Sequence, residues 1–528
     1  MKLYRAFATV GGLTLVSRVL GFLRDILLAA LLGAGPIAEA FVVAFRFPNL
    51  FRRWFGEGAF NAAFIPLFAK RLEGEGREAA RRFASEAASG LGFVLIVLST
   101  IAMLAMPWAM QVLAPGFASN PEKFDLAVVM ATIAFPYLFC MSLVALLSGV
   151  LNSLGKFVES SAVSIVLNLT LIAAMGVAVL LGHRNDRGAG IVMAWGIFAA
   201  GVLQLLLLID GARRNGLLPR LVRPRLSEDM RRLIRLGVPG VIAGGATQIN
   251  IVIGGVIASW QAGAVSWLYY ADRLYELPLA IIGIAIGVVL LPEVSRHLRA
   301  GDEAAVHDAQ NRSLEFAMLL TVPASAALAV IPHEVVSVLF ERGAFRPEDT
   351  QQVARALALF AFGLPAFVMI KVFSPAYFAR EDTRTPMRYA AISLTANTLG
   401  SIGLFLLFKE LGYSPHLGIA IATTFGGWLN AILLWLTLRR RRQFIADRRL
   451  TRALLVIAVA SAVMAAALVL LSGQVLTPWL TAGRPILERT TALAALIATG
   501  AIVYFGLLLA AGTLRLDMLA RLARRGRR

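Results

Sequence analysis

The chain has 528 residues, of which 58% are hydrophobic and only 16% are charged. Soluble domains are about 45–50% apolar and about 25% charged, so this composition excludes an ordinary soluble protein. A formal net charge of +20 would suggest a nucleic-acid partner in a soluble protein. Membrane proteins, however, gather Lys and Arg in cytoplasmic loops, so we expect no nucleic-acid partner. The single cysteine, Cys140, excludes an internal disulfide and a cysteine-based metal site.

The apolar runs predict an all-α polytopic membrane protein, because about 20 apolar residues in a helix cross a bilayer. In chain order we expect about fourteen spans, at 9–33, 36–70, 88–113, 125–151, 160–182, 188–212, 236–258, 266–295, 313–331, 350–378, 387–408, 416–438, 452–472 and 486–511. The first run is no cleaved signal sequence, since Arg18, Arg24 and Asp25 interrupt it and no small-residue cleavage site follows.

The second span decides the orientation of everything after it. Residues 36–51 alone are too short to cross, and Arg52 and Arg53 then interrupt the apolar run. We interpret 36–70 as one long crossing that is broken near Gly56 and Gly58. If this segment did not cross, every later loop would change sides and the charge bias described next would be reversed.

The distribution of Lys and Arg indicates that both termini are cytoplasmic. With the N-terminus inside, the cytoplasmic segments and the span ends beside them hold 35 of the 51 Lys and Arg, whereas the outer loops and the span ends beside them hold 8. Such a bias supports an even number of spans. The richest cytoplasmic segments are 213–235 and 439–452, which we expect to serve topology and contact with anionic membrane lipids.

Recurring prolines and short strings indicate an internal duplication. Pro48 and Pro278, Pro66 and Pro292, Pro107 and Pro332, and Pro136 and Pro365 are 225–230 residues apart, and Pro115-Gly116-Phe117 resembles Gly343-Ala344-Phe345. Two six-helix halves in parallel orientation are a transporter architecture. We therefore predict an N-lobe at 1–212, a basic linker at 213–235, a C-lobe at 236–438, a basic loop at 439–451, two further helices at 452–511 and a basic cytoplasmic tail at 512–528.

Charged residues inside the membrane are concentrated in the opening helices of the two halves. They are Arg18, Arg24 and Asp25 in the first span, Glu39, Arg46, Arg52, Arg53 and Glu57 in the second, and Asp272, Arg273 and Glu276 in the eighth. Buried charges are costly and face the bundle interior. Five arginines face three acids in the first two spans, and guanidinium groups bind phosphate through paired hydrogen bonds. The pattern favours an anionic, phosphorylated substrate.

The same residues could instead form structural ion pairs. Spacing along the helices would allow Arg18 with Asp25, Arg53 with Glu57 and Arg273 with Glu276. No catalytic constellation is present: the sequence has neither a phosphate-binding P-loop nor an HExxH motif. We expect no enzyme activity, no cofactor and no metal site, and energy for transport would come from an ion gradient or the membrane potential.

Five strings together resemble a known family. They are 17–25 (SRVLGFLRD), 44–50 (AFRFPNL), Arg52-Arg53 with 57–60 (EGAF), 115–117 (PGF) and 266–274 (SWLYYADRL). They are similar to the MurJ (MviN) lipid II flippases of the multidrug/oligosaccharidyl-lipid/polysaccharide exporter superfamily. The resemblance implies two six-helix lobes with alternating access in the bacterial inner membrane. The substrate would be lipid II, the undecaprenyl-pyrophosphate-linked disaccharide-pentapeptide precursor of peptidoglycan, with its tail in a groove formed by the last two spans.

The resemblance also assigns roles to residues. Arg24, Arg52 and Arg273 would bind the pyrophosphate headgroup, and Ser17, Arg18, Asn49 and Arg53 would line the same site. Asp25, Glu39, Glu57, Asp272 and Glu276 would act in gating or charge pairing, although many members have Asp where this chain has Glu39. Some members are thought to bind sodium through groups on spans 7, 11 and 12, but these interiors contain no acid here.

Three other functions remain open at this stage. An O-antigen or other polysaccharide-lipid flippase of the same superfamily would share the fold and the cationic cavity. A cation-coupled drug exporter would require a cavity rich in Asp and Glu. A membrane scaffold that contacts cell-wall synthesis proteins would not require buried arginines.

Overall fold

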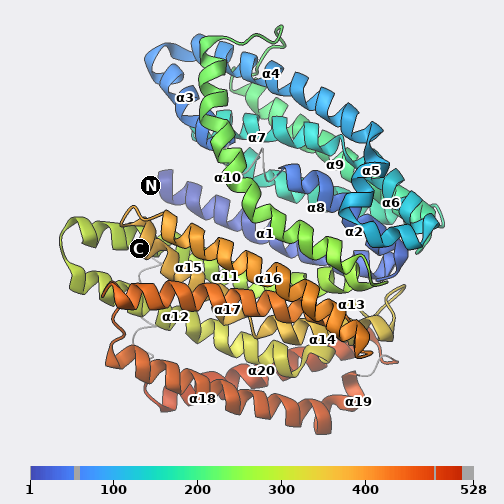
Figure 1. The fold of residues 1–528 in the computed structure, drawn as a ribbon, viewed down its shortest axis with the longest axis vertical. Helices are drawn as coiled ribbons and strands as arrows, with labels where there is room; N and C mark the ends of the chain where they lie inside the picture. Colours follow the sequence, from blue (N-terminus) through green and yellow to red (C-terminus); the bar gives the residue numbers. More distant parts are fainter. Residues whose placement is uncertain (1, 53–59, 481–482, 514–528) are drawn as a thin grey trace. The chain divides into compact units, whose positions relative to one another are not determined.

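The computed structural model describes residues 2–52, 60–480 and 483–513. In these ranges the backbone is almost entirely helical and contains no β-strand, which confirms the expected all-α class (Figure 1). The chain forms two compact units. The first comprises Met1–Ser266 together with Arg342–Arg346, and the second comprises Trp267–Glu341 together with Pro347–Arg528.

The first unit contains the helices up to α10. They are α1 (Lys2–Leu32), α2 (Pro36–Arg52), α3 (Phe60–Gly74), α4 (Gly76–Leu104), α5 (Met106–Leu113), the 3-10 turn η2 (Pro115–Ser119), α6 (Pro121–Ala134), α7 (Tyr137–Ser153), α8 (Val158–Leu180), α9 (Arg187–Arg214) and α10 (Glu228–Ala258). Helix α1 packs on α8, and α2 packs on α6. Helix α10 packs on α3, so the first unit includes the helix that we expected to open the second half. The division of the sequence at 213–235 and 439–451 stays a prediction.

The second unit begins within α11. Its helices are α11 (Ala264–Arg299), α12 (Glu303–Val330), α13 (Pro332–Phe340), α14 (Pro347–Ala361), α15 (Leu364–Phe378), α16 (Arg384–Glu410), α17 (His416–Arg440), α18 (Arg448–Leu470), the π-helical turn η3 (Leu471–Leu476), α19 (Thr477–Leu480) and α20 (Ile486–Ala510). Helix α16 packs along α17, and α18 packs on both α12 and α20.

Polar caps and prolines set where these helices begin. The side chains of Asn120, Asp186 and Asp302 each accept a hydrogen bond from the backbone N–H three residues on, at the starts of α6, α9 and α12. Such a cap satisfies one of the N–H groups that has no partner within the helix.

The proline pairs occupy matching places in the two halves. Pro48 and Pro278 lie inside α2 and α11, and Pro107 and Pro332 lie in the first turn of the short helices α5 and α13. Helices α2 and α11 continue past their prolines, whereas Pro107 and Pro332 lie where a short helix begins, a position at which proline's missing N–H has no partner to lose. The matching positions of these prolines support the duplication that the sequence indicates.

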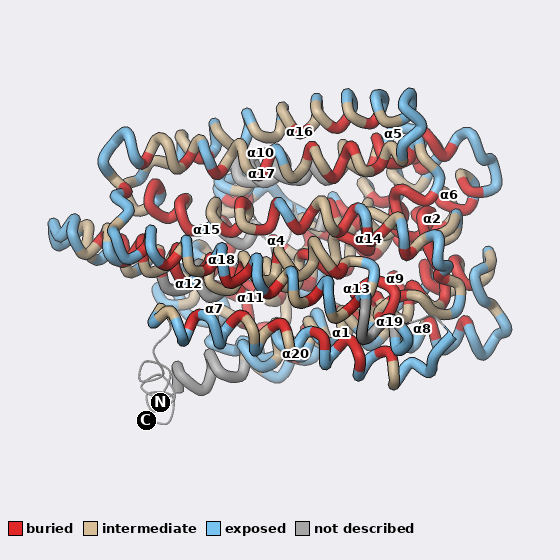
Figure 2. Tube along the Cα trace, turned by 90° about the horizontal axis from the view of Figure 1, so that it is seen from below, coloured by how far each residue is buried: buried red, intermediate tan, exposed pale blue. Residues whose placement is uncertain are grey.

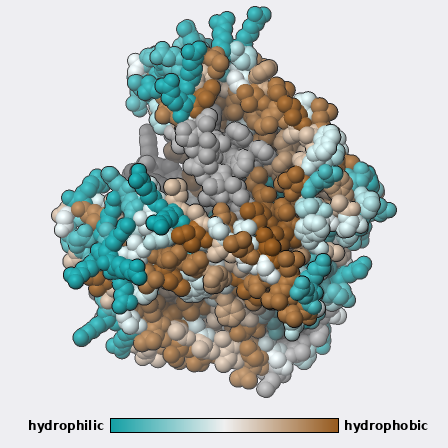
Figure 3. All heavy atoms as spheres, viewed as in Figure 1, coloured by the Kyte–Doolittle hydropathy of each residue, from teal (hydrophilic) through white to brown (hydrophobic). Residues whose placement is uncertain are grey.

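The surface of both units suits a lipid environment. Ten described helices or helix pairs are long and apolar enough to cross a membrane. The helices at four of the expected spans are not among these ten, namely at 9–33, 36–70, 236–258 and 266–295, so the count of fourteen spans stays a prediction. Helix α16 shows the pattern well: it exposes Leu399, Ile402 and Leu406, and exposed residues follow its outer side in Figure 2. Hydrophilic side chains gather instead at helix ends, for example where α17 ends and α18 begins (Figure 3).

Candidate functional site

Arg24 is held on α1 by its neighbour and by α8. Its Nε and Nη2 donate to Asp25 Oδ1 at 3.1 and 2.7 Å, and its Nη1 donates to Asn168 Oδ1 at 3.0 Å. Asn168 Nδ2 in turn donates to the backbone carbonyl of Ser17 at 2.9 Å. The side chains of Arg24 and Asp25 are only 12% and 4% exposed. Two guanidinium edges are therefore fixed by groups in the first unit, which orients the positive charge.

The other expected binding residues of the first unit are described in part. Arg18 is half-buried on α1, and Asn49 is half-buried on α2. Arg52 ends α2, and its side chain lies outside the described part of the structure, as do all atoms of Arg53 and Glu57.

The second unit contains the remaining charges on α11. Arg273 Nη1 donates to Glu276 Oε2 at 3.0 Å, and the guanidinium lies over the ring of Tyr269 at 4.9 Å from its centroid. The side chains of Arg273 and Glu276 are 32% and 44% exposed. Asp272 is half-buried beside them. The Arg273–Glu276 pair is thus formed as the spacing allowed, but with substantial access to both partners.

Glu39 lies in a buried ion pair that the sequence did not reveal. Glu39 and Lys123 pair directly, with side chains 1% and 7% exposed. Lys123 also lies 3.7 Å from the centroid of the Phe117 ring. The second carboxylate oxygen, Glu39 Oε1, accepts the backbone N–H of Val265 at 3.2 Å. This carboxylate therefore joins α2, α6 and the start of α11 within the first unit.

Sequence reasoning did not find the partners of Lys123 and Asn168. We counted Lys123 as an outer-loop charge, although its place three residues after the capping Asn120 indicated the first turn of a helix. Asn168 forms hydrogen bonds between helices, as amide side chains in membrane spans ordinarily do. Its partners Ser17 and Arg24 are 151 and 144 residues away in the chain, and no local signal could have paired them.

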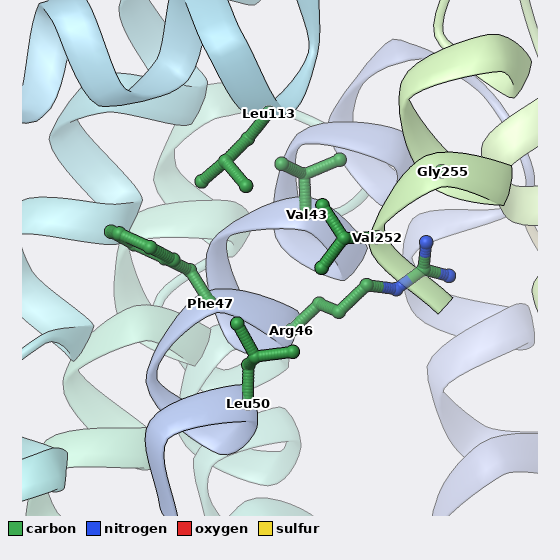
Figure 4. Close-up of a pocket in the computed structure, with 7 residues that line it drawn as sticks. All are labelled: Val43, Arg46, Phe47, Leu50, Leu113, Val252 and Gly255. Atoms are coloured by element: carbon green, nitrogen blue, oxygen red, sulfur yellow. The ribbon is translucent and has the colours of Figure 1, made fainter. Parts of the chain in front are cut away.

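A cavity between α2, α5 and α10 contains one more arginine. It is small and partly open to its surroundings, and it is lined by Val43, Arg46, Phe47, Leu50, Leu113, Val252 and Gly255. Arg46 is the one charged residue among these seven, and Figure 4 shows its side chain extending toward α10 beside Gly255. A Cβ at Gly255 would collide with Arg46 Nη1, so this glycine makes room for the guanidinium.

Nothing in the described residues forms a metal-binding cluster. No group of three or more His, Cys, Asp or Glu side chains comes together in residues 2–52, 60–480 and 483–513. Polar contacts of α16 and α17 are instead made by amides and hydroxyls: Ser401 and Thr423 both donate to Asn397 Oδ1, at 3.3 and 3.4 Å.

Comparison with known proteins identifies the family. The family model described as "Lipid II flippase MurJ" matches residues 28–487. The chain belongs to the MurJ family of lipid II flippases. It is 45% identical to a probable lipid II flippase MurJ of Rhizobium tropici, over 100% of this chain and 98% of that protein. It is 47% identical to the corresponding protein of Rhizobium meliloti (strain 1021), over 100% of this chain and 97% of that protein.

Solved structures agree on the fold. A lipid II flippase MurJ in an inward closed conformation has a TM-score of 0.75 at 24% identity, covering 94% of this chain and 97% of that chain. An inward-facing multidrug resistance transporter of the MATE family, in the MOP superfamily, has a TM-score of 0.65 at 15% identity, covering 80% and 94%. The fold is therefore common to flippases and drug exporters, and the family model and the relatives of 45–47% identity separate the two. The resemblance found in the sequence is confirmed.

Proposed function

We propose that this chain flips lipid II from the inner to the outer leaflet of the bacterial inner membrane by alternating access. Membership of the MurJ family is the observation that carries this proposal. The relatives of 45–47% identity match this chain over almost their whole length, and they are named as probable lipid II flippases. Both termini would be cytoplasmic, and α18 and α20 would form the groove for the polyprenyl tail. Their exposed apolar side chains, including Leu455, Val459 and Ile502, suit that role.

In this proposal Arg24, Arg52 and Arg273 bind the pyrophosphate headgroup. A guanidinium presents several N–H groups in one plane, so it can contact a carboxylate and a phosphate along different edges. The contacts of Arg24 with Asp25 and Asn168, and of Arg273 with Glu276, then orient the charge for the substrate. Arg18, Ser17, Asn49 and Arg53 would complete the site, and Glu39, Glu57 and Asp272 would act in gating or pairing.

The test compares membrane abundance with lipid II exposed on the outer leaflet for Arg24→Ala, Arg52→Ala and Arg273→Ala. Headgroup binding predicts normal abundance and lost exposure of lipid II. The Arg→Lys variants should lose less than the Ala variants, because Lys keeps the charge without the forked geometry, and Arg→Glu should abolish transport. Arg187→Ala is the matched control, since Arg187 is 55% exposed and pairs with Asp125 at 2.7 Å.

A purely structural role predicts a different result. Loss of the arginine would leave a carboxylate without its partner and would reduce the amount of folded protein. Asp25→Asn would then restore the abundance of Arg24→Ala, and Glu276→Gln that of Arg273→Ala. Lost abundance that is rescued in this way would reject headgroup binding.

A further inference from the structure

One side of α18 is cationic in its first two turns and apolar along the rest of the helix. Exposed residues follow one another at spacings of four, three and four, which places them on one side of the helix. They are Arg448, Arg452, Leu455 and Val459. We call the exposed apolar residues on this side the α18 stripe: Leu455, Val459, Val463 and Leu470. The opposite side is buried, and α18 packs on α12 and α20.

Two acids near the start of α18 already have basic partners. Asp447 caps the helix by accepting the backbone N–H of Leu450, and it also pairs with Arg312 of α12. Glu315 of α12 pairs with Arg312 as well, and with Arg449 at 3.4 Å. The two carboxylates beside the first turn of α18 are therefore engaged by other arginines than those on the exposed side.

Arg448 and Arg452 are exposed and have no such partner. In the described part of the chain neither guanidinium forms a hydrogen bond or an ion pair. Residues four apart on a helix have Cβ atoms about 5–6 Å apart, so both guanidiniums can reach one anionic group. The following residues, 453–483, include no Asp, Glu, Lys or Arg, so the positive charge is confined to one end of α18.

The spacing along α18 places the two arginines at the depth of lipid phosphate groups. From Leu455 to Leu470 the helix rises about 23 Å, which is most of the hydrocarbon thickness of about 30 Å. Arg452 precedes Leu455 by about 4.5 Å, so it lies where the hydrocarbon ends. In the proposed topology this boundary faces the cytoplasm, and guanidinium groups there meet the phosphates of the inner leaflet.

We propose that Arg448 and Arg452 form an initial docking site, which binds the diphosphate of lipid II in the inner leaflet while the polyprenyl tail lies on the α18 stripe. The inference rests on the proposed function and topology. A diphosphate esterified at both ends carries two negative charges on a single chain, which matches two guanidiniums above one apolar stripe. A phosphatidylglycerol molecule presents one charge and two chains. Guanidinium binds phosphate oxygens through paired hydrogen bonds, so the site holds the lipid before its headgroup reaches Arg24 and Arg273.

The test follows binding at the start of α18 with a fluorophore. An environment-sensitive fluorophore is attached to Ala446→Cys in a Cys140→Ala background, since Ala446 is exposed and lies just before Arg448. The purified full chain in neutral mixed micelles is titrated with lipid II, with phosphatidylglycerol or with cardiolipin. The apparent Kd is compared among Arg448→Gln, Arg452→Gln, the double variant and the control Arg440→Gln.

Arg440 is a matched control because it differs from the two docking arginines in position alone. It is exposed, it has no ion-pair partner in the described part of the chain, and it ends α17 within the same basic segment. Each Arg beside an anionic lipid contributes about fivefold in affinity, so Arg448→Gln and Arg452→Gln should each weaken lipid II binding by about that factor, and the double variant by about thirtyfold. Arg440→Gln removes the same charge and should leave the Kd unchanged.

Equal Kd values for the double variant and Arg440→Gln would overturn the docking site. Binding of phosphatidylglycerol or cardiolipin as tight as that of lipid II would overturn it too, since the surface would then serve anionic phospholipids in general. Arg24→Ala should leave the fluorescence response intact, and a lost response would assign the bound lipid to the headgroup site instead. The response requires no transport, so a chain that binds lipid II here but never exposes it on the outer leaflet would uphold the docking site and reject the proposed function.

Discussion

The buried pair of Glu39 and Lys123 gives a prediction with a large expected effect. Both side chains are almost fully enclosed, at 1% and 7% exposure, so removing one partner leaves a charge without water or a counter-ion. Breaking a buried pair in this way costs about 3–5 kcal/mol of folding free energy. We expect Lys123→Met to lose an amount in this range, since Met keeps the contact with the Phe117 ring but not the charge.

The double variant separates the charge from the packing. In Glu39→Gln with Lys123→Met no buried charge remains, and the amide oxygen of Gln can still accept the N–H of Val265. Replacing both members of a buried pair is often close to neutral, so the double variant should recover most of the stability that either single variant loses.

The assay is equilibrium unfolding of the purified full chain in mixed micelles, for the two single variants and the double variant. Asp125→Asn is the control from the same helix, because Asp125 pairs with Arg187 at the surface, where side chains are 58% and 55% exposed. An exposed pair contributes about 0–1 kcal/mol. The reasoning fails if Lys123→Met costs no more than Asp125→Asn, or if the double variant loses the sum of the two single effects.

Two further predictions concern an ion pair between the α15–α16 turn and the end of α17, and the topology. Hydrogen bonds from the Arg441 guanidinium, at 2.7 Å, and from Thr385 lower the pKa of the Asp382 carboxyl from 3.8 to about 2. The stabilisation is therefore complete at neutral pH and is lost as the pH falls from 3.8 through 2. The unfolding free energies of wild type and Arg441→Gln, measured at a series of pH values, should converge at low pH, and a constant difference would contradict this. For the topology, a reporter fused after Gly343 should lie outside and one fused after Arg441 inside, and the reverse result at either site would break the fourteen-span arrangement.

The sequence alone determined the fold class and the family, and it marked the start of some helices, such as α5 and α13. Hydrophobic runs and the Lys and Arg bias can be read from the sequence alone. A hydrophobic run of sufficient length enters the bilayer as a helix, and the Lys and Arg bias sets its orientation, whatever the tertiary contacts are. Prolines such as Pro107 and Pro332 act locally on the backbone, so their effect could be predicted without knowing any neighbour. The family could be identified in the same way, because its motifs are short runs of consecutive residues that can be read directly from the sequence.

The tertiary structure alone decided which charges meet. Helical spacing placed Arg18 and Asp25 on one face, yet Asp25 accepts a hydrogen bond from the adjacent Arg24, whose other edge is held by Asn168 from α8. Spacing defines the face of a helix but not the helix that packs against it, and the energy of a buried charge depends on that second helix. The same limit hid the Glu39–Lys123 pair, since its members are 84 residues apart in the chain and meet through packing that no local pattern specifies.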